Sequence, residues 1–84
     1  MNSYRLLVAW DVIESLNRLP IATRKVLKNV LLQIGNFPDL MSDFCEPNDR
    51  GIPLDVHLSH GFAIKYWTDF ADRHVKILEI EPAD

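Results

Sequence analysis

Cysteine, positive charge and long apolar runs are all scarce in this sequence. Its one cysteine, Cys45, excludes an internal disulfide and gives no basis for a zinc site, so we expect neither a metal nor a cofactor. No apolar run reaches the ~18 residues of a membrane-spanning helix. Nine lysines and arginines stand against twelve aspartates and glutamates, for a net charge of −3. Since nucleic-acid binders usually carry a basic footprint, this balance counts against a broad nucleic-acid surface.

The beginning of the chain lacks the basic segment and apolar core of a signal peptide. We therefore expect a cytoplasmic protein with no membrane partner. Of the 84 residues, 48% are hydrophobic and 25% are charged, which is typical of globular rather than disordered chains. The length predicts one small domain over residues 1–84.

Two helices are predicted in the first half of the chain. They follow a short strand at Tyr4–Ala9, whose aliphatic residues suggest burial on both faces. Asp11 is placed to cap the first helix, which Pro20 ends. The second helix should end at Gly35, and its unbroken apolar stripe consists of Val26, Leu27, Val30, Leu31 and Ile34. Because Pro20 leaves only a tight corner, the two helices should form an antiparallel hairpin.

The basic residues of the second helix lie off this stripe. We expect Arg24, Lys25 and Lys28 to form a solvated face. Residues 37–53 contain three prolines and little periodicity. They predict a long loop, with at most one turn of helix near residues 40–44.

Leu54–Trp67 predicts two strands joined by a tight turn. If the apolar side chains of both strands share one face, Leu58 must pair with Phe62. Residues 59–61 are then a three-residue loop, with Gly61 at the position that requires positive φ.

The opposite face of this hairpin carries most of the chemistry. In the predicted register it presents Asp55 across from Lys65, with His57 and Trp67 on the same face and His60 at the tip. His57 is a candidate base, because an unperturbed imidazole titrates near physiological pH, and Lys65 is a candidate phosphate contact. Two readings stay open: a working surface, or an exposed histidine and a plain Asp55–Lys65 cross-strand pair. Trp67 could stack a base or pack against the protein, and His60 could be a solvated turn residue.

Residues 74–80, HVKILEI, predict the last strand. The order of elements is then β-α-α-β-β-β. It predicts an α+β fold, with the helix hairpin on one face of a small, mainly antiparallel sheet.

This layout resembles the RelE/ParE superfamily of toxins from bacterial type II toxin–antitoxin systems. The matching features are Trp10 after the first strand, the LNRLP turn at 16–20, Phe37-Pro38, GFAIKYW at 61–67 and VKILEI at 75–80. The resemblance implies a RelE-like fold and a cognate antitoxin as partner. If the chain is an enzyme, it implies an mRNA endoribonuclease that works with the ribosome.

The resemblance also implies where a site would lie. Ribonucleases of the family place a base, an acid and positive charge on the open face of the sheet. The RelE branch has lysines where this chain has Asp55 and His57, and an arginine at Ala63. The YafQ-like branch has a catalytic histidine in an Asp-x-His strand, which Asp55-Val56-His57 matches.

Three functions stay open. The first is a ribonuclease toxin with Asp55, His57 and Lys65 as catalytic residues, and Trp67 and His60 as RNA contacts. The second is a toxin-fold protein that acts by binding, either as a gyrase-type poison or as a remnant that still binds its antitoxin. The third is an unrelated interaction module.

Overall fold

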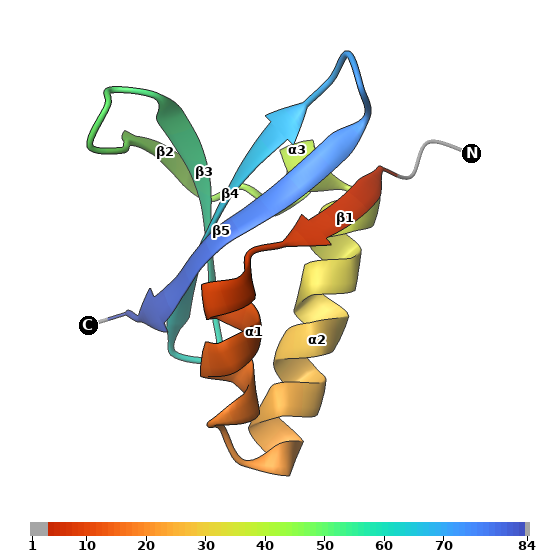
Figure 1. Ribbon diagram of the computed structural model, residues 1–84, viewed down its shortest axis with the longest axis vertical. Helices are drawn as coiled ribbons and strands as arrows, with labels where there is room; N and C mark the ends of the chain where they lie inside the picture. Colours follow the sequence, from red (N-terminus) through yellow and green to blue (C-terminus); the bar gives the residue numbers. More distant parts are fainter. Residues whose placement is uncertain (1–3, 84) are drawn as a thin grey trace.

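The computed structural model describes residues 4–83 and contains a five-stranded sheet in the order β1-β5-β4-β3-β2. All neighbouring strands are antiparallel except β1 and β5, which are parallel. The predicted α+β class and helix hairpin are confirmed (Figure 1). The elements are β1 (Arg5–Val8), α1 (Trp10–Asn17), α2 (Ile21–Asn36), α3 (Pro38–Met41), β2 (Phe44–Pro47), β3 (Pro53–Ser59), β4 (Phe62–Asp69) and β5 (His74–Pro82).

The core lies between the α1–α2 pair and one face of the sheet. The stripe of α2 predicted from its 3.6-residue period is buried there, apart from Val26, which is 37% exposed. The cluster consists of Val12, Leu16, Leu27, Val30, Leu31, Ile34, Ile64, Tyr66, Val75 and Ile77. We call the sheet face that packs on these helices the core face, and the other the open face.

The first strand and the helix ends differ from the prediction. Because the helices cover one face of the sheet, only Leu6 and Val8 of β1 pack against the core, and Leu7 on the open face is 39% exposed. Helix α1 begins at Trp10 with Ala9 as its N-cap, because the Ala9 amide still bonds to Ile77 on β5 and the chain enters the helix directly from the sheet. Helix α2 continues past Gly35, where a Cβ atom would lie 3.5 Å from the Cβ of Leu6.

Residues 37–53 are more ordered than predicted. They contain the short helix α3 and the edge strand β2, which pairs with β3. The expected helical turn exists, but it begins at Pro38, where proline suits the first turn of a helix. The strand was missed because its four residues, FCEP, are too short to show alternation and end in a proline.

The predicted register of the β3–β4 hairpin is wrong by one residue. Leu58 pairs with Ala63 and Ser59 with Phe62, so His60 and Gly61 alone form the turn. Both have positive φ, 53° and 82°, as a two-residue type I′ turn requires. Because the side-chain period is two, the shift moves Lys65 to the same face as Val56, and Asp55 and His57 to the other.

The physical reason for this error is that both faces of β3 are apolar in part. Leu54 and Val56 are 5% and 0% exposed, yet they lie on the open face rather than in the helix-covered core. An alternation of apolar residues therefore did not identify the core face in this strand.

Candidate functional site

Lys65 lies at the centre of the open face and is surrounded by glutamates from strands β2 and β5. Its Nζ atom is 2.7 Å from Glu46 of β2, and 2.8 Å from Glu81 and 3.6 Å from Glu79 of β5. The hydrogen bonds with Glu46, followed by those with Glu81, hold the pKa of Lys65 above its ordinary value. The ammonium is therefore charged but fully engaged by carboxylates.

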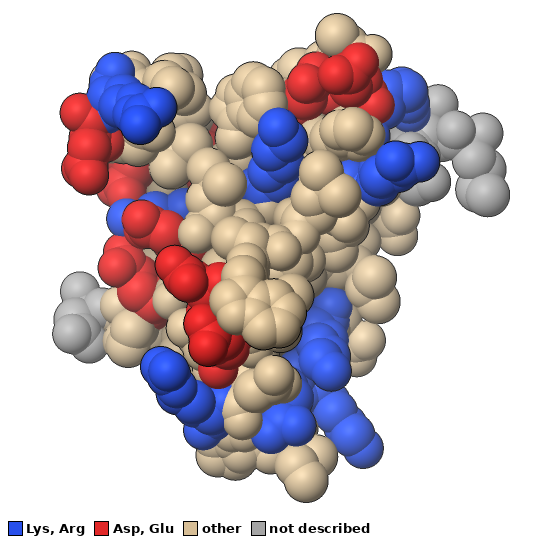
Figure 2. All heavy atoms as spheres, viewed as in Figure 1, with Lys and Arg blue, Asp and Glu red and all other residues tan. Residues whose placement is uncertain are grey.

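Two shallow hollows meet at Lys65 and Glu46, and we call them together the open-face groove. Acidic side chains gather on the side of the molecule that carries β2 and the end of β5 (Figure 2). The hollow toward the β3–β4 turn is lined by Phe44, Glu46, Val56, Leu58, Ala63, Lys65, Glu81, Pro82 and Ala83. The other is lined by Glu46, Pro47, Asn48, Asp49, Arg50, Ile52, Leu54, Lys65, Leu78 and Glu79.

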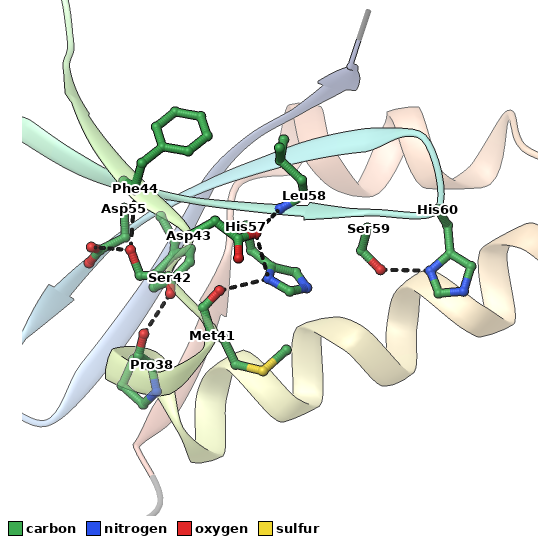
Figure 3. A network of polar contacts seen from close by, with 11 residues as sticks. Pro38, Met41, Ser42, Asp43, Phe44, Asp55, His57, Leu58, Ser59 and His60 are labelled. Carbon is green, nitrogen blue, oxygen red and sulfur yellow. Dashed lines mark hydrogen bonds and ion pairs between the residues drawn. The ribbon is translucent and has the colours of Figure 1, made fainter.

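His57 lies on the core face, beyond the reach of the open-face groove. Its Nδ1 is 2.6 Å from the carbonyl oxygen of Met41 and 3.4 Å from Oδ2 of Asp43 (Figure 3). A carbonyl oxygen can only accept, so Nδ1 carries a proton, and the neutral tautomer compatible with this contact has its lone pair on Nε2. The imidazole thus fixes the segment after α3 to strand β3.

Asp55, two residues before His57 on β3, binds the same segment. Its Oδ1 accepts hydrogen bonds from Ser42 Oγ at 2.8 Å and from Cys45 Sγ at 3.2 Å. The hydrogen bond and the charge of Asp55 raise the pKa of the Cys45 thiol. Burial, with the charge of Asp55 second, raises the pKa of Tyr66, whose hydroxyl donates to the Pro38 carbonyl at 2.6 Å. Asp55 therefore acts as a hydrogen-bond acceptor that holds Ser42 and Cys45 to strand β3.

The structure separates the residues that the sequence predicted to act together. Asp55 and His57 lie on the core face, and Lys65 and Trp67 on the open face, so the predicted Asp55–Lys65 pair is wrong. Trp67 is 36% exposed, with its ring 5.2 Å from the Nζ of Lys76.

His60 lies apart from both groups. It is at the hairpin tip, where its Nδ1 is 2.6 Å from Ser59 Oγ.

Sequence reasoning missed the three glutamates. A signal for two of them exists, because Glu79 and Glu81 are two residues apart in a strand and therefore share a face. Only the correct register puts Lys65 opposite Glu79 and on that same face. Glu46 gave no signal, because the strand that carries it was not predicted.

Among residues 4–83, no three histidine, cysteine or acidic side chains are grouped as they would be to hold a metal ion. No helix in the same range has the length and apolarity to cross a membrane.

The arrangement of the elements matches solved structures of RelE toxins. The archaeal RelE–RelB complex from Pyrococcus horikoshii superposes with a TM-score of 0.79, covering 95% of this chain and 94% of that chain at 19% identity. The chain has a RelE-like fold. The same fold occurs in the RelBE2 toxin–antitoxin complex of Mycobacterium tuberculosis, with a TM-score of 0.80 at 14% identity over 99% of this chain and 94% of that one.

The intact RelBE complex of E. coli shares the RelE-like fold with a TM-score of 0.71 at 16% identity, over 98% of this chain and 99% of that chain. No protein-family model matches the sequence, and no curated protein matches it. The likeness is therefore one of fold, and the chemistry of the site has to be argued from this chain's own residues.

Proposed function

We propose that this chain is the toxin-fold component of a toxin–antitoxin pair and that it acts by binding its target rather than by cleaving RNA. The solved structures that resemble it are RelE toxins, three of them in complex with RelB antitoxins. The observation that carries the second half of the proposal is the charge of the open face. Three glutamates surround its central lysine.

Cleavage of a ribose–phosphate bond needs positive charge beside the phosphate as negative charge develops there. Lys65 is the cation at the centre of the open face, and its ammonium already bonds to Glu46 and Glu81. A phosphate entering the groove would displace one of these carboxylates and lie against the others. Like charges at such distances repel, so the groove disfavours a nucleic-acid backbone.

The second candidate, a ribonuclease with His57 as base, has one observation in its favour. The bond from Nδ1 to the Met41 carbonyl leaves Nε2 as the lone-pair nitrogen, which a general base requires. Its surroundings are nevertheless anionic, because Asp43 faces the ring and Asp55 lies two residues away. Lys65 extends from the opposite face and cannot assist.

Growth of a bacterial host after induction of the chain tests the proposal. We expect arrest with the wild type, arrest unchanged by Lys65→Met or by His57→Gln, and intact messenger RNA in the arrested cells. The product of a small gene adjacent to the one for this chain, if it is the antitoxin, should relieve the arrest when co-expressed and should co-purify with the chain. Lys76→Met, which removes a cation from the same face near Trp67, is the matched control for Lys65→Met.

Two results would contradict the proposal. Message cleavage by the purified chain in a translating extract, lost in His57→Gln, would establish the ribonuclease instead. Soluble expression without arrest, together with no binding to the neighbouring protein, would remove the toxin assignment altogether.

A further inference from the structure

We propose that the open-face groove binds a cationic, amphipathic segment of a partner protein, with an apolar side chain on the groove floor and lysine or arginine beside the glutamates. This deepens the proposed function by stating the chemistry of the partner, and it rests on the proposal that the chain acts by binding.

The floor of the groove is apolar and uncovered. Phe44 and Leu58 are 44% and 47% exposed although both project from paired strands, and Val56 and Ala63 lie beside them. At the other end Ile52 and Leu78 are 44% and 37% exposed. Each hollow therefore has exposed apolar side chains beside charged ones, a combination that is characteristic of a surface that another protein covers.

The rim sets the charge of that partner. The groove is lined by four carboxylates, Glu46, Asp49, Glu79 and Glu81, and by two cations, Arg50 and Lys65. Of the two cations, Lys65 lies at the centre of the groove, and its ammonium is paired with three glutamates. The surplus is negative, so complementarity favours lysine and arginine and disfavours phosphates or an acidic peptide.

The spacing of the rim suits a regular segment. Glu79 and Glu81 are two residues apart on one strand, so their side chains are separated by roughly 7 Å along it. Basic residues at i and i+2 of an extended segment, or at i and i+4 of a helix, have a similar separation. Glu79 is 57% exposed, and its carboxylate lies farther from Lys65, at 3.6 Å, than those of Glu46 and Glu81. It can therefore accept hydrogen bonds from a partner.

The test is selection of binders to the full chain from a displayed library of random sixteen-residue peptides. We expect the enriched peptides to combine lysine or arginine with leucine or aromatic residues. Their affinity should fall about tenfold or more for Glu79→Gln/Glu81→Gln. That variant keeps the Lys65–Glu46 ion pair, and it leaves the backbone pairing of β4 and β5 unchanged.

Asp11→Asn/Glu14→Gln is the matched control, because it removes two negative charges from α1 instead. It should change affinity less than twofold. Leu58→Ser removes part of the apolar floor without altering charge, and it should weaken binding as well. Amide chemical shifts of the labelled full chain should change along β2 to β5 when peptide is added.

Several outcomes would overturn the inference: no enriched peptide, enrichment of acidic or uncharged peptides, equal affinity for both double variants, or shift changes confined to α1 and α2. Dimerisation of the chain that Glu79→Gln/Glu81→Gln abolishes would also overturn it, because a second copy would then be the occupant. Growth arrest reports on the proposed function separately: arrest without basic-peptide selectivity removes only this inference, and selectivity without arrest removes only the toxin assignment.

Discussion

The hydroxyl of Tyr66 donates a hydrogen bond of 2.6 Å to the carbonyl oxygen of Pro38, which precedes it by 28 residues. Both residues are buried, and the bond connects the core face of β4 to the first residue of α3. It acts together with His57 and Asp55, which hold the next residues of the same segment.

Tyr66→Phe should therefore destabilise the protein by about 1–3 kcal/mol, because it leaves the Pro38 carbonyl buried without a donor. The loss should be concentrated in α3, where exchange of the Met41 amide, which bonds to Phe37, should accelerate. Urea unfolding and hydrogen exchange measure the two effects. Tyr4→Phe is the control and should stay within about 0.5 kcal/mol; an equal loss there would contradict the role of the Pro38 bond.

Arg24 connects the two helices at their corner. Its guanidinium donates to the carbonyls of Leu16, Asn17 and Leu19, at 3.2, 3.3 and 3.0 Å, at the C-terminal end of α1 and in the turn that follows it. The expectation that Arg24 belongs to a solvated face was wrong for this reason.

Arg24→Gln should lower the free energy of unfolding by about 1–3 kcal/mol, since up to three carbonyls lose a charged donor. Arg24→Lys should not restore it, because one ammonium lacks the fork that reaches several acceptors. Lys25→Gln, one residue along the helix and exposed, is the matched control. Equal effects at the two positions in thermal unfolding would refute the capping role.

His60 occupies a backbone conformation that favours other residues. Its φ of 53° is the left-handed region, and asparagine followed by glycine is the preferred pair for a type I′ turn. His60→Asn should stabilise the protein by up to about 1 kcal/mol, whereas Gly61→Ala should destabilise it, because φ is 82° there. Chemical denaturation decides. A loss with His60→Asn would favour the three-residue loop over the observed turn.

Cys45 should react slowly for an exposed thiol. Asp55 raises its pKa through a hydrogen bond and its charge, so less thiolate is present at any pH near 8 than in a free cysteine. Alkylation by iodoacetamide at pH 8 should therefore be slower in the folded chain than in urea, and Asp55→Asn should accelerate it several-fold. The control is Asp43→Asn. It removes a carboxylate from the same segment, but one that contacts His57 and accepts from the Leu58 amide instead of from Cys45. No acceleration in Asp55→Asn would show that Asp55 does not govern the thiol.

The helices were predictable from sequence because their buried apolar side chains recur with the 3.6-residue period of an α-helix. The stripe from Leu27 to Ile34 faces a single layer, and hydrophobic spacing is sufficient to orient such a helix. The order of elements outside residues 37–53, the turn at Pro20 and the final strand followed from similarly local signals. The β3–β4 register did not, because Leu54 and Val56 are buried on the face that the helices do not cover.

The predicted grouping of Asp55, His57 and Lys65 on one face was wrong for the same reason. A one-residue shift exchanges every side chain between faces, so Asp55 and His57 left the face of Lys65 together. The glutamates that replaced them come from β2 and β5, and a hairpin considered alone contains no information about its neighbours. Contacts between elements distant in the chain were the part that local pattern could not supply.

The strand order has a consequence for synthesis of the chain. β5 lies between β1 and β4, so the strand that joins the N-terminal part of the fold to the β3–β4 hairpin is the last of the five to leave the ribosome. Until residues 74–82 emerge, β1 has no hydrogen-bonding partner and the apolar stripe of α2 lacks Val75 and Ile77. The nascent chain therefore acquires its open face only in one late step, and incomplete translation products have no assembled surface with which to bind a target.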